Sequence, residues 1–379
     1  MDYTAAARQG GGIGRYAREL ITAILATDAK NRFVLLAAVA GLGQSWTSEK
    51  ARLRRTIDAR RLALRELPLT DDWMARLWQR LRLPLPAELI TGRVDCFYSP
   101  DFVLPPLHRD TGALLTVHDL SFLRYPETFV PALRAYLEKV VPRSIARADH
   151  ILADSEATRR DLIDLLSAPP NKVTTLYSGV SPRFSPEAAP RERTHLQARY
   201  AIGRRPYILA VGTVQPRKNY VRLMQACDAL AEQRDLDLVI VGRPAWLSES
   251  IVAAAAQRPY VQMMGFLEDT DLPALYRQAA VLAFPSLYEG FGLPPLEAMA
   301  CGTPVVASAA SSVPEVVGDA GLLVDPLDVS AWTEALSRAL DDPSLREPLR
   351  RAGLLRAAEF TWPRAAQHWR SVVESLQRP

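Results

Sequence analysis

The sequence predicts an α/β protein built from two facing domains, each a doubly wound parallel sheet of the Rossmann-like type. Three observations predict this class. The chain has 379 residues, of which 48% are hydrophobic and 23% charged, enough for two globular cores. Short apolar runs alternate with amphipathic stretches, as strands alternate with crossover helices. A stretch rich in proline and charge divides this pattern into two halves.

The first half, residues 1–180, is predicted to be one domain and carries six strand candidates. These are Phe33–Val39, Leu62–Leu67, Val94–Tyr98, Ala113–Val117, His150–Ala153 and Val173–Tyr177. Residues 181–206 then change character, with Pro182, Pro186 and Pro190 set among charged residues. Such a composition is typical of a linker that opens a new domain.

The second half, residues 207–358, has the features of a nucleotide-binding sheet. Its strand candidates end at Val211, Val241, Met264, Phe284 and Ala307, and each is followed by glycine, by serine or by the Pro285–Gly292 loop. Ligands of open parallel sheets lie beyond the carboxyl ends of the strands, where small residues let the backbone approach the ligand. Residues 359–379 follow as a C-terminal segment.

Composition excludes several classes of protein. The net charge is +4 and the pI about 9.0, too mild a basic bias to predict nucleic acid as a partner. Cys96, Cys227 and Cys301 are far apart, which predicts a reducing, cytoplasmic compartment and neither disulfides nor a metal site. No apolar run approaches the roughly 20 residues of a membrane span, and the N-terminus lacks a signal peptide.

One local excess of charge leaves two interpretations open. Residues 51–66 hold six arginines against Asp58 and Glu66, a net of +4. A solvated helix face accounts for this excess. Alternatively, the segment is a peripheral contact with an anionic membrane surface, assisted by apolar residues at helical spacing just downstream. These residues, which also suit a core, are Trp73, Met74, Leu77, Trp78 and Leu81.

The segment from Tyr288 to Glu297 predicts an anion site. Pro294 suits the first turn of a helix and has no N–H group. The backbone donors at this helix start must therefore come from Gly290, Phe291, Gly292 and Leu293, and such donors suit a diphosphate. Glu289 and Glu297 bracket the segment, and their carboxylates suit the paired hydroxyls of a ribose or a hexose. Taken alone, the segment could also be a Pro-Gly turn with surface glutamates.

A basic loop strengthens this interpretation. After the strand candidate Tyr207–Val211 comes Gly212, and then Arg217 and Lys218 just before a helix. Two cations at a carboxyl strand end could neutralise a diphosphate, although a solvated charged loop would look the same in isolation. Both loops together indicate a nucleotide-diphosphate site.

Two further features lie in the first half. Gly12, Gly14 and Arg15 belong to a G-x-G-x-x-A motif, but no useful strand precedes it and the next strand ends without an acidic residue. A dinucleotide-binding interpretation therefore fails, and a glycine loop that opens a helix near an acceptor or phosphate is preferred. His118 follows a strand candidate, where it serves either catalysis or structural hydrogen bonding.

These motifs resemble the retaining glycosyltransferases of family 4, whose two-domain fold is called GT-B. The most specific match runs from Pro285–Gly292 through Glu297–Val306, with its glutamates spaced E-x7-E. The likeness extends over nearly the whole chain through shorter motifs: Gly12–Tyr16, Val117–Leu120, Ala153–Ser155, Tyr177–Val180 and Pro216–Asn219.

The resemblance implies a role for each residue. Arg217 and Lys218 would hold the donor diphosphate, Glu297 the ribose hydroxyls and Glu289 the transferred sugar. His118 would face the donor sugar from the first domain, which is the acceptor side. The family generally needs no metal or other cofactor. The last helix, roughly Trp362 to Leu376, would pack back across the first domain.

The closest likeness is to bacterial mannosyltransferases of polysaccharide assembly, through the segments His118–Phe122 and Tyr125–Glu127. It makes GDP-mannose the expected donor and a saccharide or lipid-linked saccharide the expected acceptor. Two alternatives share the fold: a sugar-nucleotide epimerase, and a non-catalytic nucleotide-binding subunit.

The N-terminus departs from this family. Its members usually begin with an apolar strand that ends near the position of Asp2, and that strand appears to be missing here. Loss of an inner strand would leave two neighbours unpaired. We therefore expect either a natural start upstream or a less stable protein.

Overall fold

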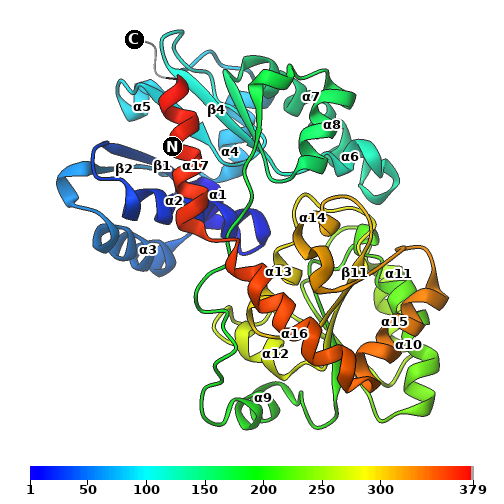
Figure 1. The fold of residues 1–379 in the computed structure, drawn as a ribbon. Helices are drawn as coiled ribbons and strands as arrows, with labels where there is room; N and C mark the ends of the chain where they lie inside the picture. The colour runs from blue at the N-terminus through cyan, green and yellow to red at the C-terminus, as the bar shows by residue number, and fades with distance from the viewer. Residues whose placement is uncertain (377–379) are drawn as a thin grey trace. The chain divides into compact units, whose positions relative to one another are not determined.

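The computed structural model describes residues 1–376, which form two compact units (Figure 1). Unit 1 comprises Met1–Leu120, Ala135–Gly179 and the C-terminal segment from Thr361. Unit 2 comprises Ser121–Arg134 and Val180–Phe360. All strand pairings in the described part of the chain are parallel, as the alternation of strand and helix predicts.

Unit 1 is built on two groups of strands. Four pair in the order β3-β4-β5-β6, and β1 pairs with β2. The strands are β1 (Phe33–Ala38), β2 (Leu62–Leu67), β3 (Cys96–Ser99), β4 (Gly112–Val117), β5 (His150–Ala153) and β6 (Val173–Thr175).

The first three residues form no strand of their own, but they join these two groups through backbone hydrogen bonds. The Tyr3 amide donates to the Leu36 carbonyl (2.7 Å), and the Asp2 amide donates to the Tyr98 carbonyl (2.9 Å). Asp2 and Leu36 form an isolated parallel bridge. Met1–Tyr3 is too short to show a periodic pattern in the sequence, yet it supplies backbone hydrogen bonds to both β1 and β3, so neither edge is left unpaired.

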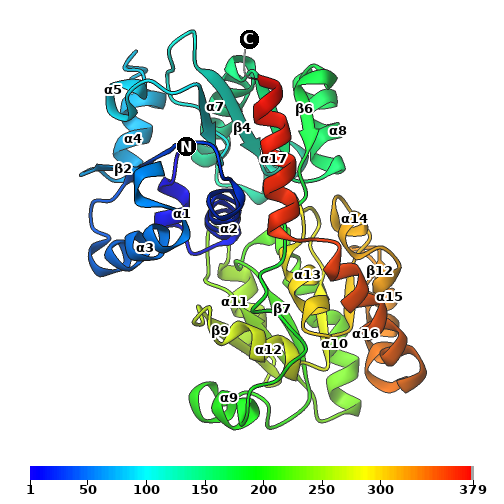
Figure 2. The same ribbon diagram turned by 60° about the vertical axis from the view of Figure 1, so that its left-hand side comes forward.

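The helices of unit 1 cover both faces of its sheet. They are α1 (Thr4–Arg8), α2 (Gly12–Thr27), α3 (Gly43–Thr56), α4 (Asp71–Ala75), α5 (Glu88–Thr91), α7 (Pro131–Arg147), α8 (Glu156–Leu166) and α17 (Trp362–Leu376). The final helix α17 lies alongside α2 in both Figure 1 and Figure 2. Trp362, Ala366, Trp369 and Val373 of α17 are buried at helical spacing in the core shared with α2.

Unit 2 contains a six-stranded sheet in the order β12-β11-β10-β7-β8-β9. Its strands are β7 (Tyr207–Val211), β8 (Asp237–Val241), β9 (Val261–Gly265), β10 (Val281–Phe284), β11 (Val305–Ser308) and β12 (Leu322–Val324). The sequence pattern predicted the first five of these ends to within one residue. The sequence analysis missed β12, because three residues give no usable periodicity.

Helices surround this sheet. They are α6 (Ser121–Arg124), α9 (Glu192–Tyr200), α10 (Tyr220–Gln233), α11 (Glu249–Ala256), α12 (Leu272–Gln278), α13 (Leu293–Ala300), α14 (Val313–Val317), α15 (Val329–Asp341) and α16 (Pro343–Ala358). From β7 the chain adds β8 and β9 on one side of the sheet and then β10, β11 and β12 on the other side. The boundary between β7 and β10 is therefore the topological switch point where open α/β sheets bind ligands.

Two segments differ from the expected boundaries. Residues 181–206, expected as a linker, contain α9 and bury Phe184, Leu196 and Ile202 in the core of unit 2. In the sequence, the prolines and charged residues of this segment masked the pattern of its three buried apolar residues. Ser121–Arg134, expected in the first domain, groups with unit 2, where the Trp246 indole donates to the Thr128 carbonyl (2.8 Å).

Candidate active site

The loop after β7 is fixed by hydrogen bonds to neighbouring loops. It runs through the turn Pro216–Lys218 to Asn219, whose φ of +59° is left-handed. The Asn219 amide donates to the Pro285 carbonyl (3.0 Å) and the Pro326 carbonyl (2.6 Å). The Leu287 amide donates to the Arg217 carbonyl (2.9 Å). These bonds tie the loop after β7 to the loops after β10 and β12.

Two glycines bring the backbone close at this edge of the sheet. A Cβ at Gly242, just after β8, would lie 1.9 Å from the Gly212 carbonyl oxygen. Gly212 itself has a φ of +150°, and a Cβ there would lie 3.1 Å from Lys218 Cε. Glycine at Gly242 lets the Gly212 backbone approach, and glycine at Gly212 leaves room for the far end of the Lys218 side chain.

Three sequence-predicted residues meet here: Arg217, Lys218 and Glu289. Lys218 Nζ lies 2.5 Å from Glu289 Oε1, and Arg217 Nη1 lies 3.3 Å from the same oxygen. Lys218 and Glu289 are both buried. Burial alone would raise the pKa of the Glu289 carboxyl, but the charges of Lys218 and Arg217 outweigh it and lower that pKa. The cluster is therefore an ionised carboxylate held between two cations.

Serines from the loop after β11 hold the Glu289 segment in place. Ser312 Oγ donates to the carbonyls of Glu289 (2.8 Å) and Phe291 (2.7 Å), and Ser311 Oγ donates to the Glu289 carbonyl (2.5 Å). Ser311, Ser312 and the supporting role of Asn219 were not predicted from the sequence. Their signal, small polar residues after neighbouring strands, was present but not distinctive.

The other residues predicted to bind the donor substrate differ in where their backbone and side chains lie. Gly290 and Gly292 are buried, and Gly292 precedes α13 with a φ of +126°. Leu293 begins α13, whereas the Phe291 side chain packs in the core against Phe360. Any contact of Phe291 with a ligand must therefore come from its backbone.

Glu297 is buried more deeply than Glu289. It is 2% exposed, and its Oε2 accepts a hydrogen bond from the Tyr276 hydroxyl (2.8 Å). Thr303 Oγ1 in turn donates to the Tyr276 carbonyl (2.6 Å). Glu297 is thus held by α12, and its contact with ribose hydroxyls remains a prediction.

In unit 1, His118 follows β4 and pairs with a carboxylate. Its Nδ1 lies 2.7 Å from Asp154 Oδ2, and its Nε2 lies 2.9 Å from the Pro100 carbonyl oxygen. A carbonyl can only accept, so Nε2 carries a proton. Burial would lower the pKa of His118, but Asp154, with Asp101 and Asp119, raises it to about 9. The ring is therefore an imidazolium with both nitrogens engaged inside unit 1.

The glycine loop lies beside His118. The Tyr16 ring packs edge-on against His118, with ring centroids 4.9 Å apart. Gly12 is the first residue of α2, and Arg15 is half-buried on the same helix. A Cβ at Gly14 would lie 2.0 Å from the Gln9 carbonyl oxygen, so this glycine permits a tight turn from α1 into α2.

Among residues 1–376, no group of three or more His, Cys, Asp or Glu side chains could hold an ion. An Asp-x-Asp pair, Asp235 and Asp237, flanks the start of β8, where Asp235 faces Arg205 at 2.8 Å.

Comparisons with known proteins agree with this architecture. A family profile described as "Glycosyltransferase Family 4" matches residues 10–184, and one described as "Glycosyl transferases group 1" matches residues 192–356. The crystal structure of Anabaena HepE in complex with UDP and glucose superposes with a TM-score of 0.73 at 17% identity, covering 97% of each chain.

Several relatives in sequence are named as mannosyltransferases and others as D-inositol 3-phosphate glycosyltransferases. The O-antigen chain mannosyltransferase B of Escherichia coli is 34% identical over 93% of this chain and 92% of its own length. The serotype-specific mannosyltransferase WbdA of Escherichia coli is 32% identical over 66% of this chain, which matches 32% of that longer protein.

The fold and the two family profiles identify a glycosyltransferase with the two parallel-sheet α/β domains of the GT-B class. The chain belongs to glycosyltransferase family 4, over nearly its whole length.

Proposed function

We propose that this enzyme transfers mannose from GDP-mannose to a saccharide or lipid-linked saccharide, with retention of anomeric configuration and without a metal. The observation that carries the proposal is the buried cluster of Arg217, Lys218 and Glu289 at the switch point of unit 2. The choice of mannose is supported by relatives named as mannosyltransferases.

The cluster suits the charge that develops during transfer. The bond from the sugar's anomeric carbon to the diphosphate oxygen breaks, and the leaving diphosphate gains negative charge. Arg217 and Lys218 stabilise that charge in a buried setting, where electrostatic interactions are strong. The acceptor oxygen then bonds to the anomeric carbon, and its proton passes to the departing phosphate.

Glu289 couples donor binding to sugar recognition. Its carboxylate shares both cations, so a diphosphate bound there competes with it for their charge. A carboxylate relieved of one cation is free to accept hydrogen bonds from sugar hydroxyls. The same residue can therefore respond to the diphosphate and contact the hexose attached to it.

A thermal-shift panel tests the donor. Wild-type protein is heated with GDP, UDP, ADP and their sugar conjugates, because a bound ligand stabilises the fold by mass action. We expect GDP and GDP-mannose to raise the melting temperature. Lys218→Met should abolish the shift, whereas Lys139→Met, which removes an exposed lysine on α7, should retain it. A shift with UDP compounds alone contradicts the mannose assignment, and no shift with any nucleotide contradicts the diphosphate site.

The same protein is proposed to contact an anionic membrane peripherally, through a surface that differs in part from the one expected. No helix within residues 1–376 is long and apolar enough to cross a membrane. Arg52 and Arg61 of the expected basic stretch pair with Glu49 and Asp28. The exposed apolar and basic side chains that suit a membrane contact lie in the next stretch, residues 73–89.

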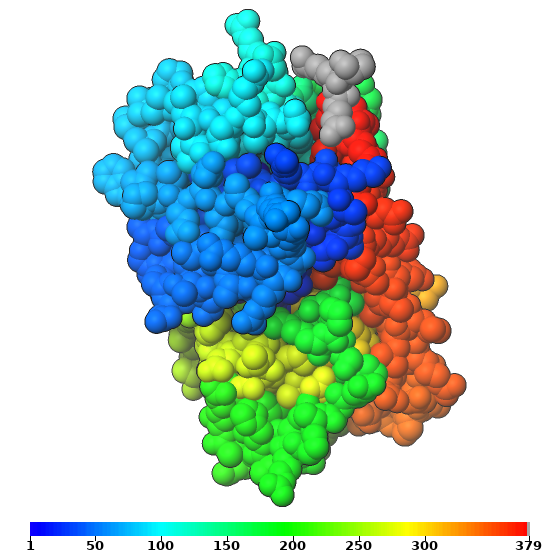
Figure 3. Space-filling model, turned by 90° about the vertical axis from the view of Figure 1, so that its left-hand side faces the viewer, coloured from blue at the N-terminus to red at the C-terminus, as the bar shows by residue number. Residues whose placement is uncertain are grey.

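Four large apolar side chains are exposed in residues 73–89: Trp73 (50%), Leu81 (65%), Leu85 (47%) and Leu89 (68%). Exposed Arg76, Arg80 and Arg82 alternate with them. Figure 3 shows the blue segments around this stretch forming much of one face of unit 1. Apolar side chains interleaved with arginines are typical of a surface that enters the headgroup region of an anionic membrane.

Liposome co-sedimentation tests this contact. We expect binding to vesicles that contain anionic lipid, and loss of binding when Leu81 and Leu89 are both replaced by serine. Leu355→Ser, which removes a 74% exposed leucine on α16 of unit 2, is the matched control. Binding that is independent of anionic lipid, or equal in all variants, contradicts the proposal.

A further inference from the structure

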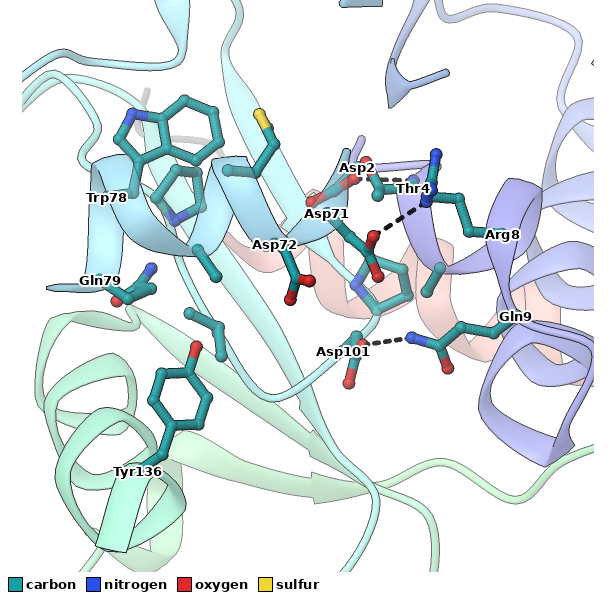
Figure 4. Close-up of a pocket in the computed structure, with 16 residues that line it drawn as sticks. Asp2, Thr4, Arg8, Gln9, Asp71, Asp72, Trp78, Gln79, Asp101 and Tyr136 are labelled. Carbon is teal, nitrogen blue, oxygen red and sulfur yellow. Dashed lines mark hydrogen bonds and ion pairs between the residues drawn. The ribbon is translucent and has the colours of Figure 1, made fainter. Parts of the chain in front are cut away.

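A cavity of about 220 Å³ lies in unit 1, where α1, α4 and the loop after β3 meet (Figure 4). It is placed at the carboxyl ends of parallel strands, next to the bridge formed by Asp2 and just beyond Ser99, the last residue of β3. Open α/β sheets bind their ligands at this edge. The cavity is smaller than the roughly 300–1,000 Å³ of sites for drug-sized ligands, and suits a single sugar ring.

The cavity is acidic. Asp2, Asp71, Asp72 and Asp101 line it, and Arg8 is the lining cation, a formal sum of four negative charges and one positive when every carboxyl is ionised. Burial raises the pKa of the Asp2 and Asp101 carboxyls. Asp71 and Asp72 are therefore the more readily ionised of the four. Arg8 Nε is paired with Asp71 (3.0 Å). This field repels an anion such as a phosphate or sulfate group, so the occupant is neutral or cationic.

The carboxylates are spread around the cavity instead of converging on a point. Asp2 Oδ1 accepts from the Thr4 amide (2.8 Å), and Asp101 Oδ2 accepts from the Gln9 amide (3.2 Å). In Figure 4 the carboxylates of Asp71 and Asp72 come from α4, and that of Asp101 comes from the loop after β3. They belong to no group that could hold a metal ion among residues 1–376. Acceptors distributed in this way match hydroxyl groups distributed around a ring.

Aromatic side chains form the opposite side of the cavity. Trp78 and Tyr136 lie there beside the Gln79 amide (Figure 4). The Trp78 indole is held by its N–H, which donates to the Leu85 carbonyl (3.0 Å). Aromatic rings offer an apolar face with a polar edge, which suits the C–H face of a sugar. Carboxylate acceptors opposite aromatic faces favour a neutral saccharide over a simple amine.

The cavity adjoins the His118 pair. Asp101 follows Pro100, whose carbonyl accepts the His118 Nε2 proton, and the Phe102 ring packs edge-on against His118 at 5.3 Å. The glycine loop shapes the other side, because Gly14 permits the close approach of Gln9, which bonds Asp101. Asp101, which lines the cavity, therefore lies in sequence between two residues that contact His118, the residue predicted to face the donor sugar.

From this geometry we infer that the cavity is a subsite for one neutral sugar ring of the acceptor, which excludes phosphorylated sugars. The inference rests on the proposed transfer to a saccharide. It assigns acceptor recognition to Asp72, Asp101, Trp78 and Tyr136, ahead of the glycine loop that the sequence indicated.

Ligand-observed NMR with two probes tests the inference. Methyl α-mannopyranoside should bind the wild-type protein, and mannose 6-phosphate should bind at least tenfold more weakly. Asp72→Ala should weaken methyl α-mannopyranoside binding at least tenfold, since Asp72 is exposed on α4 and its replacement leaves the core intact. Asp110→Ala, which removes an exposed aspartate outside the cavity, should leave binding unchanged.

A nucleotide arm separates this inference from the proposed function. The GDP thermal shift should be the same in wild type, Asp72→Ala and Asp110→Ala. A GDP shift without saccharide binding, equal binding of mannose 6-phosphate, or preferential binding of a simple amine such as spermidine overturns the subsite inference while leaving the donor site standing. If GDP does not raise the melting temperature of the wild-type protein, the proposed function is overturned instead.

Discussion

Replacing the two members of the Lys218–Glu289 pair separately should change stability and donor binding in different directions. The changes are Lys218→Met, which keeps an unbranched side chain without charge, and Glu289→Gln, which keeps the shape of the carboxylate. Both native side chains are buried, and Nζ and Oε1 are 2.5 Å apart.

The magnitude follows from burial and from the second cation. At an effective dielectric constant of 20, a charge pair at the 2.5 Å separation gains about 7 kcal/mol, and desolvation of both ions cancels much of that gain. Removing one partner of a buried pair costs about 3–5 kcal/mol. Arg217, 3.3 Å from Glu289, still pairs with it after Lys218→Met, so we expect about 2–3 kcal/mol for that variant. The double variant should cost less than the sum, with a coupling energy of about 1–3 kcal/mol.

Donor binding should discriminate between the two variants. Lys218→Met removes a diphosphate contact and should weaken GDP binding at least tenfold. Glu289→Gln removes the carboxylate that competes for Lys218 and Arg217, so GDP should bind as tightly as to wild type or several-fold more tightly. Sugar transfer by Glu289→Gln should nevertheless fall, because the acceptor for hexose hydroxyls is lost.

Urea unfolding and calorimetric titration of GDP are the assays. Each variant is measured for its free energy of unfolding and for its GDP dissociation constant, with Lys139→Met as the control for loss of an exposed lysine. Equal weakening of GDP binding by both variants would refute the competition between Glu289 and the diphosphate. Additive stability changes in the double variant would refute the pair itself.

Three further predictions follow from the structure. The raised pKa of His118, from 6.5 to about 9, means that its pairing stabilises the fold fully below pH 6.5 and is lost as pH rises to about 9, so the stability advantage of wild type over His118→Phe should shrink across that window. Gly242→Ala should cost more than about 2 kcal/mol, because its Cβ would lie 1.9 Å from the Gly212 carbonyl oxygen. Tyr276→Phe removes a hydrogen bond to buried Glu297 and should cost about 1–3 kcal/mol.

Controls for these predictions are available in the chain. Gly11→Ala, at a position with open space around its Cα, should be close to neutral in the same urea assay that is used for Gly242→Ala. Asp154→Asn should abolish the pH dependence assigned to His118, since it removes the paired carboxylate. A pH-independent difference between wild type and His118→Phe would show that the ring is not an imidazolium. A neutral Tyr276→Phe would show that Glu297 is satisfied without the phenol.

The sequence predicted the second sheet better than the first. Glycine, serine or the Pro285–Gly292 loop after each of the five strand candidates of unit 2 marked the carboxyl edge, and Gly212 and Gly242 lie there because the backbones come so close. In unit 1 the residues Met1–Tyr3 gave no signal, since a three-residue segment cannot show periodicity, and their role depends on β1 and β3 being in place.

The candidate site was predicted in part. Glu289 is far in sequence from the adjacent Arg217 and Lys218, and only parallel topology brings the two loops together at one edge. The anchoring by Ser312 and the burial of Glu297 against Tyr276 depend on side-chain packing that a motif does not encode. The acidic cavity was missed entirely, because its aspartates come from three separate segments of unit 1.

The proposed reaction is mannosyl transfer from GDP-mannose at the Arg217–Lys218–Glu289 cluster. The most direct measurement is NMR analysis of the product formed from GDP-mannose and a mannose-terminated lipid-linked saccharide. We expect a mannoside that retains the anomeric configuration of the donor, formed by wild type and lost in Lys218→Met. Transfer from UDP-glucose but not from GDP-mannose, an inverted product, or undiminished transfer by Lys218→Met would contradict the proposed reaction.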